Sequence, residues 1–323
     1  MRDYLIQTSV QLHVNFADLP FTADRDEAIA QRATERVTRA LERSGDTFAY
    51  LLPAGMDEQK KRKYTEQGLM HRDTNASPYS VFYLRMDEKL SVQTALSDHA
   101  VIGSWHENDL QMALLQARRI RQQIAGEALL ARDEEYGYLT AQPCDAGTGM
   151  RAAALVHVPM LHLTHQMDKM TKMLSQKGII LRPFSEDKTK SFGALSVIEN
   201  RYALGKNAQE RAQEVMHMAD EVLVAERNCR QVARDKGDVG IYDAVWRAYG
   251  IARYARRITC MDARNLWSSL TLGNDIGAYE IAEDALNDLW ELSCGKRPGE
   301  VDEMGNPDVL RAQRVRFLLN GGN

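Results

Sequence analysis

The stretch Gly137-Tyr-Leu-Thr-Ala-Gln-Pro-Cys-Asp-Ala-Gly-Thr-Gly-Met-Arg-Ala152 carries the most information about the fold. Its pattern predicts a strand over residues 138–140, then a turn rich in Pro143, Gly147 and Gly149, followed by an apolar run over residues 152–158. The glycines let the backbone approach a ligand closely, because they lack a Cβ atom. Arg151, just after the turn, carries a guanidinium group that can pair with phosphate or carboxylate oxygens. The stretch therefore predicts either an anion site or a tight structural turn.

The composition is that of a globular protein. The chain has 323 residues, 44% hydrophobic and 27% charged, which fits one large or two ordinary domains. A net charge of −4 gives no general attraction to nucleic acids or anionic membranes. No apolar run approaches the ~20 residues of a membrane span, and the N-terminus lacks a signal-peptide core. Four widely spaced cysteines argue against a zinc site or a disulfide framework. We expect a cytoplasmic protein with no nucleic-acid or membrane partner.

Hydrophobic periodicity predicts a mixed arrangement in the first two-thirds of the chain. Strands are expected over residues 4–16, 81–86, 90–95, 178–184 and 194–201, and helices over residues 24–44, 56–69, 109–131 and 165–176. The strands at 81–86 and 90–95 are expected to form a hairpin around Asp87-Glu88. Strand pairs and helices grouped in this way favour an α+β fold, in which helices flank an antiparallel sheet, over a doubly wound parallel sheet.

The rest of the chain is expected to be helical. Asn207 and Glu210 have the spacing of a capping box, which predicts a helix over residues 207–234. Further helices are expected over residues 243–255, 261–272, 276–292 and 307–319. The sequence Lys236-Gly237-Asp238 interrupts the helical pattern. We therefore predict two domains, residues 1–238 and an all-α domain of residues 239–323.

The stretch around the glycine turn resembles the ATP:guanido phosphotransferases, the superfamily of creatine kinase and bacterial protein-arginine kinase, whose version reads G-Y-L-T-x-C-P-T-N-x-G-T-G-L-R-A. Residues 196–205, 243–256 and 270–277 resemble further motifs of this family in the same order. The resemblance covers nearly the whole chain and is closest to protein-arginine kinase, which has an additional helical C-terminal domain. It implies a guanido-kinase-like domain that transfers the γ-phosphoryl group of magnesium-ATP to a guanidinium nitrogen, and a helical domain that dimerises.

The departures from the family fall at positions that the resemblance assigns to chemistry. Where the family has S-S-R-V-R-L-A-R-N, its three arginines fall on uncharged residues, namely Ser9, Gln11 and Val14. The family's N-E-E-D-H-L-R matches residues 95–101, which keep Asp98 and His99 but neither glutamate nor the arginine. Gln142 replaces the family's reactive cysteine. Asp145 replaces an asparagine.

The resemblance also assigns the remaining candidate site residues. The family's phosphate-covering loop, R-G-x-x-G-E-G-S-E, falls on residues 182–190, which keep Arg182 and a displaced acidic pair that includes Glu186. Arg151 and Arg182 are thus the expected nucleotide-phosphate ligands, beside the loop of Gly147, Thr148 and Gly149. Weak candidates to replace the lost glutamates are Asp98, Asp145 and Glu186. No metal site built from side chains is expected.

A motif of the protein-arginine kinases that binds phosphoarginine, R-D-x-x-R-A, matches residues 307–312. The chain keeps Asp308 and Arg311 but has Pro307 in place of the first arginine. Proline is common in the first turn of a helix. A plain helix start, with Arg311 on a solvated face, is therefore the alternative to a phosphoarginine site.

Three hypotheses follow for the function. The first is a catalytically inert pseudokinase with no cofactor and a regulatory or scaffolding role, present as a homodimer or as a heterodimer with an active paralogue. It would either act on an active kinase or bind arginine-phosphorylated proteins. The second is a divergent but active kinase that uses magnesium-ATP. The third is an interaction module built on residues 241–323.

Overall fold

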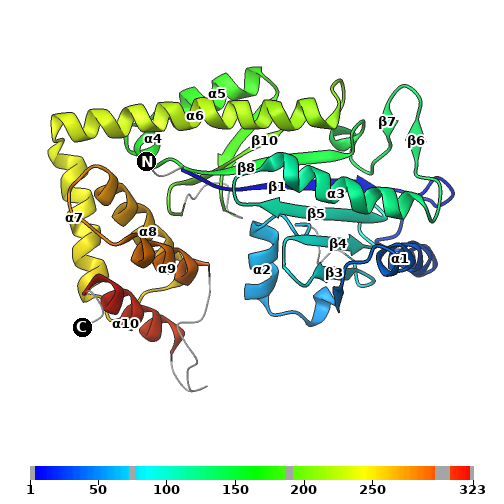
Figure 1. Cartoon of the computed structure of the whole chain (residues 1–323), viewed down its shortest axis with the longest axis horizontal. Helices are drawn as coiled ribbons and strands as arrows, with labels where there is room; N and C mark the ends of the chain where they lie inside the picture. Colours follow the sequence, from blue (N-terminus) through cyan, green and yellow to red (C-terminus); the bar gives the residue numbers. More distant parts are fainter. Residues whose placement is uncertain (1–3, 73–76, 186–191, 295–305, 321–323) are drawn as a thin grey trace. The chain divides into compact units, whose positions relative to one another are not determined.

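The computed structural model describes residues 4–72, 77–185, 192–294 and 306–320 (Figure 1). The chain divides into two compact units. The first comprises Met1–Leu155, Leu174–Leu181 and Val197–Ala219, and the second comprises Val156–Met173, Arg182–Ser196 and Asp220–Asn323. The domain boundary predicted after residue 238 falls at the turn between α6 (Ala208–Lys236) and α7 (Val239–Tyr254), and as a division into folding domains it stays a prediction.

An eight-stranded sheet has the order β2-β3-β4-β5-β1-β8-β10-β9. Its strands are β1 (Leu5–Val14), β2 (Phe48–Leu51), β3 (Val81–Arg85), β4 (Leu90–Thr94), β5 (Ala100–His106), β8 (Met150–His157), β9 (Ile179–Pro183) and β10 (Leu195–Asn200). Strands β2, β3, β4, β5 and β1 pair antiparallel in that order. This arrangement confirms the predicted antiparallel sheet, and β3 and β4 form the predicted hairpin.

Helices lie on both faces of the first part of the sheet. Alternate residues of a strand point to opposite faces, and β3 shows which helix lies on which face. The Tyr83 hydroxyl lies 2.7 Å from the Thr38 hydroxyl of α1 (Glu27–Glu42), whereas Phe82 and Leu84 pack on the other face. Helix α3 (Leu110–Ala125) crosses β1 and β5 (Figure 1).

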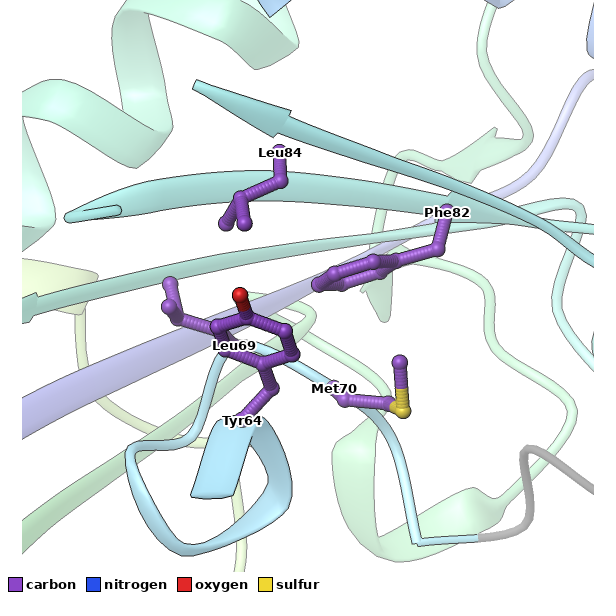
Figure 2. Close-up of a cluster of buried hydrophobic side chains, with 5 residues drawn as sticks. All are labelled: Tyr64, Leu69, Met70, Phe82 and Leu84. Atoms are coloured by element: carbon purple, nitrogen blue, oxygen red, sulfur yellow. The ribbon is translucent and has the colours of Figure 1, made fainter. Parts of the chain in front are cut away.

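The face that carries Phe82 and Leu84 is covered by α2 (Glu58–Glu66) and the segment that follows it. Figure 2 shows Tyr64, Leu69 and Met70 packed against Phe82 and Leu84. Burying such side chains stabilises the fold by about 1.5–3 kcal/mol each.

The segment after α2 lies in direct contact with the sheet. A Cβ atom at Gly103 would lie 2.7 Å from the Gly68 carbonyl oxygen and 2.8 Å from Leu69 Cα. Gly103 therefore permits a close backbone approach. This packing places residues 67–71 beside one face of β1, which the candidate site also uses.

The second unit is mainly helical. It contains α4 (Pro159–Leu163), α7, α8 (Cys260–Asp275), α9 (Glu283–Ser293) and α10 (Pro307–Leu319). Its core includes Met160 of α4, Ala233 of the C-terminal part of α6, Val245 of α7, Leu272 of α8 and Ile276 just after α8. None of the helices in the described ranges is long and apolar enough to cross a membrane.

Most predicted elements are present, with shifted ends. Helix α10 has the predicted bounds of 307–319, and the capping box of α6 forms, because the Glu210 carboxylate accepts from the Asn207 amide at 3.0 Å. Helix α3 ends at Ala125 rather than at residue 131, and α9 begins at Glu283 rather than at residue 276. The strand predicted over 138–140 shortens to β7 (Gly137–Tyr138), which pairs with β6 (Arg132–Asp133).

Candidate functional site

Asp98, in the turn between β4 and β5, is a buried carboxylate held by three donors. His13 Nδ1 lies 2.8 Å from Asp98 Oδ2, while Asn15 Nδ2 and the Ala141 amide donate to Oδ1 at 2.5 and 2.7 Å. Burial alone would raise the pKa of Asp98, but these hydrogen bonds, led by the one from His13, hold it below its ordinary value. Asp98 is therefore an ionised residue and a weak base.

His99, the other residue kept from the family's acidic motif, has a structural role. Its Nδ1 accepts a hydrogen bond from the Phe16 amide at 3.0 Å, so the ring proton is on Nε2, which donates to the Pro20 carbonyl at 2.8 Å. Burial lowers the pKa of His99, which agrees with a neutral ring. His99 thus fixes the chain that follows β1.

His13, which the sequence did not single out, connects two of the candidate carboxylates. Its Nδ1 binds Asp98, and its Nε2 lies 3.8 Å from Asp145 Oδ2. Only 3% of His13 is exposed, and Nε2 has no hydrogen-bond partner among the described residues. The His71 ring meets it edge-on, with ring centroids 5.8 Å apart. One feature of the sequence could have indicated His13: this histidine stands within a predicted strand, at the position where the family motif has alanine.

Asp145 and Arg151 form an ion pair. One terminal nitrogen of Arg151, Nη2, donates to both carboxylate oxygens of Asp145 at 2.9 Å. Burial alone would lower the pKa of Arg151, but the carboxylates of Asp145 and Glu199 raise it. The Cys144 sulfur lies 3.9 Å from the same nitrogen. The predicted phosphate ligand is thus paired with a carboxylate of its own chain.

The glycine turn is held by hydrogen bonds within the chain. The Gly147 amide donates to the Tyr138 carbonyl at 3.0 Å, and the Thr148 amide to the Ala203 carbonyl at 3.3 Å. Gly147 has φ +107°, and a Cβ atom there would lie 2.9 Å from Leu204 Cα. Close backbone packing therefore accounts for this glycine, and a phosphate-binding role for Gly147, Thr148 and Gly149 stays a prediction.

The positions of the family's N-terminal arginines hold no cation. Gln11 donates through its amide to the carbonyls of Gly68 at 3.0 Å and Met70 at 3.5 Å. A Cβ atom on Gly68 would lie 2.8 Å from the Ser9 side chain. Val14 is buried. Uncharged side chains and the chain's own backbone therefore occupy these positions.

The other expected nucleotide-phosphate ligand, Arg182, belongs to the second unit. Arg182 lies in β9 and donates to the Pro183 carbonyl at 3.4 Å. Glu186 lies outside the described residues. Within the described ranges, no cluster of three or more histidine, cysteine or acidic side chains could hold a metal ion.

Asp308 and Arg311 form a pair at the start of α10. Arg311 Nη1 donates to Asp308 Oδ1 at 3.0 Å and to the Ile258 carbonyl at 2.7 Å. Only 4% of Arg311 is exposed, and its Nε has no hydrogen-bond partner in the described ranges. The expectation of a solvated Arg311 is wrong, because the side chain reaches inward to the residues before α8. Pro307 is the first helical residue, after the N-cap Asn306, as predicted for a plain helix start.

Comparison with known proteins defines the class. The family of the ATP:guanido phosphotransferase C-terminal catalytic domain matches residues 29–229. The chain therefore belongs to the ATP:guanido phosphotransferase family, as the motifs predicted.

Individual proteins of this family are similar to the chain over most of its length. Protein-arginine kinases from Bacillus cereus (strain AH187) and Bacillus thuringiensis subsp. konkukian (strain 97-27) are 26% identical to the chain over 331 residues, covering 98% of it and 92% of each relative. Among solved structures, the duplicated taurocyamine kinase from Schistosoma mansoni with bound transition state analog components gives a TM-score of 0.61 at 19% identity, covering 70% of this chain and 33% of that chain. Lombricine kinase gives 0.60 at 16% identity, covering 73% and 68%. The chain spans about a third of the taurocyamine kinase, and these structures support the fold alone.

Proposed function

We propose that this protein-arginine-kinase-like protein is a pseudokinase with a regulatory or scaffolding role. The observation that carries the proposal is the Arg151–Asp145 pair, in which one nitrogen of the predicted phosphate ligand donates at 2.9 Å to both oxygens of a carboxylate. A nucleotide phosphate at Arg151 would have to displace this carboxylate.

The other expected phosphate contacts support the same conclusion. Phosphoryl transfer depends on positioning and on neutralising the phosphate charge. Ser9, Gln11 and Val14 supply no positive charge, and each lost charged hydrogen bond is worth about 1.5–3 kcal/mol. The residues present thus fit magnesium-ATP poorly.

The chain also lacks the general base that phosphoryl transfer to a guanidinium group would need. A guanidinium group has a pKa above about 12, so its attack on phosphorus needs an oriented carboxylate. The sequence lacks both glutamates of the family motif, and Asp98 is held by three donors that lower its pKa. Removing a general base ordinarily slows a reaction by roughly 10²–10⁴.

We also propose the partners that the family suggests. These are a second copy of the chain or an active paralogue, and proteins that carry phosphoarginine. The proposed phosphoarginine contact at the start of α10 rests on Asp308 and Arg311, which the chain keeps from the family motif.

The test of the pseudokinase is a long incubation of concentrated protein with magnesium-ATP and an arginine-rich unfolded protein, followed by mass spectrometry. We expect no phosphoarginine. An Asp98→Ala variant is run in parallel, and product that disappears in this variant would overturn the proposal and establish a divergent kinase that uses Asp98. The observation that favours this alternative is that His13 brings Asp98 and Asp145 to one place.

A further inference from the structure

The Arg151–Asp145 pair occupies a place where an anion from solution could bind. We propose that Arg151 is a binding site for tetrahedral oxyanions, that Asp145 closes this site as an internal competitor, and that protonation of His13 opens it. The proposal rests on the proposed function, because it explains how a family member could lack phosphate binding in its resting state while keeping the arginine.

Arg151 is accessible to solvent, whereas Asp145 is buried. The Arg151 side chain is 35% exposed, whereas that of Asp145 is 4% exposed. An incoming sulfate or phosphoryl group can therefore approach the guanidinium from solvent. Because an arginine binds carboxylates and phosphates with the same donors, the two anions compete directly.

Displacing Asp145 from Arg151 would leave a buried carboxylate without its cation. Such an uncompensated charge is strongly unfavourable, so an external anion binds weakly unless Asp145 gains another partner. His13 is placed to be that partner, since its Nε2 lies 3.8 Å from Asp145 Oδ2 and makes no hydrogen bond within the described part of the chain.

The hydrogen bond to Asp98 decides where an added proton goes. Asp98 is an ionised acceptor, so His13 donates to it through Nδ1. A second proton on the ring must then bind Nε2, where the new N–H faces Asp145. Protonated His13 would thus compensate Asp145 while Arg151 takes the external anion.

The surrounding charges make the two events interdependent. Asp98 and Asp145 face the His13 ring from the β4–β5 turn and from the residues before the glycine turn, and His71 faces it from the segment after α2. Arg151 lies beyond Asp145 and also interacts with Glu199, so a protonated His13 and Arg151 would compete for the Asp145 carboxylate. Proton and oxyanion therefore strengthen each other's binding.

Sulfate is the suitable probe, because it stays a dianion across the pH range in which phosphate itself titrates. Binding to the full chain is measured by calorimetry at about pH 5.5 and about pH 8, a range over which an imidazole can change its charge. For the wild type we expect binding at least roughly tenfold tighter at the lower pH, the equivalent of one charged hydrogen bond.

Three variants identify the groups involved. Asp145→Asn, which restores the family's residue, should bind sulfate at about pH 8 at least roughly tenfold more tightly than the wild type and should lose most of the pH dependence. Arg151→Gln should bind at neither pH. Glu199→Gln is the matched control, because it removes another carboxylate near Arg151 and should retain the pH dependence. Circular dichroism confirms that each variant is folded.

A folded Asp145→Asn protein that binds sulfate no more tightly than the wild type at about pH 8, or that keeps the full pH dependence, would overturn the inference. Phosphoarginine formation by the wild type is a separate readout that tests the pseudokinase. A negative sulfate result without phosphoarginine therefore refutes the oxyanion site and leaves the proposed function standing.

Discussion

His13 in the first compact unit and His157 in the second are both almost fully buried, with 3% and 1% of their surfaces exposed. His157 uses both nitrogens, since Nε2 lies 2.8 Å from the Ser268 hydroxyl and Nδ1 lies 3.4 Å from Arg230 Nη2. Its ring also packs on Trp267 at 4.6 Å between centroids. His13 makes one polar contact within hydrogen-bonding distance, to Asp98, and its Nε2 has no such partner among the described residues.

The surroundings of His157 show what a purely structural polar network looks like. Glu226 accepts from the amides of Met160 and Leu161, at 3.0 and 2.9 Å, and from Arg230 Nε at 2.7 Å. Arg230 also donates to Asp275. Buried polar groups are normally all satisfied in this way. His13 Nε2, by contrast, has no hydrogen-bond partner among the described residues, and the proposed oxyanion site depends on this nitrogen.

The largest expected effect is the loss of the second unit's network. Arg230→Met removes the cation hydrogen-bonded to the buried Glu226 carboxylate and the contact to the partly buried Asp275, so we expect a loss of roughly 3–5 kcal/mol in unfolding free energy. Urea unfolding followed by circular dichroism measures it. Arg247→Met is the control, because the Arg247–Asp243 pair is exposed at 76% and 55% and should change stability by less than about 0.5 kcal/mol. Equal effects of both substitutions would contradict the structural role of the network.

Removing the charge at Asp98 is expected to have an intermediate effect. Asp98→Asn leaves part of a set of three donors unpaired, which should cost about 1–3 kcal/mol near neutral pH. The folded pKa of Asp98 lies below its ordinary value, so its contribution is present above the ordinary aspartate range and is lost as the pH falls through the lowered pKa. The stability difference between wild type and variant should therefore shrink in acid, as measured by thermal unfolding against pH.

Asp18 provides the control for this pH dependence. A hydrogen bond from Arg36 lowers the pKa of Asp18 to about 2, but the Asp18 side chain is 56% exposed. We expect Asp18→Asn to change stability by less than about 1 kcal/mol, because solvent screens the pair. A larger acid-dependent loss for Asp18→Asn than for Asp98→Asn would show that burial is not the deciding factor.

A small effect is also expected for the difference between the two histidines. His13→Asn and His157→Asn remove rings of the same size, but only His157→Asn removes a hydrogen bond at Nε2 and the Trp267 contact. We expect His157→Asn to be more destabilising by about 1 kcal/mol, measured by urea unfolding of both variants. If His13→Asn costs as much as His157→Asn, His13 Nε2 has a stabilising partner and the oxyanion inference loses its main support.

Elements with a local signal were predictable, and those without one were not. The capping box at Asn207 and Glu210 and the proline start of α10 depend on neighbouring residues, and both formed as predicted. Strand β5 was missed, since five of its seven residues, from Ala100 to Ser104, are buried without interruption and so lack the alternation that indicates a strand. Helix α4 was missed because a single turn gives no periodicity.

Some residues of the candidate site were predictable from the sequence, and others were not. The motifs indicated Asp98, Asp145 and Arg151, because the resemblance to the family fixed their positions along the chain. They did not indicate that Asp145 would neutralise Arg151, since an ion pair requires the orientation of both side chains. The sequence did not indicate a role for His13, because its partner Asp98 lies 85 residues away in the chain.

Residue identity, spacing and hydrophobic period were enough to assign the family, to predict an antiparallel sheet flanked by helices and to show the loss of charged residues at the family's phosphate positions. Tertiary structure alone decided which polar groups became partners. Strand pairing placed His13 between Asp98 and Asp145 and gave its Nε2 no hydrogen-bond partner in the described part of the chain. Hydrogen bonds and ion pairs depend on distances of a few ångströms between distant residues, which no local pattern in the chain encodes.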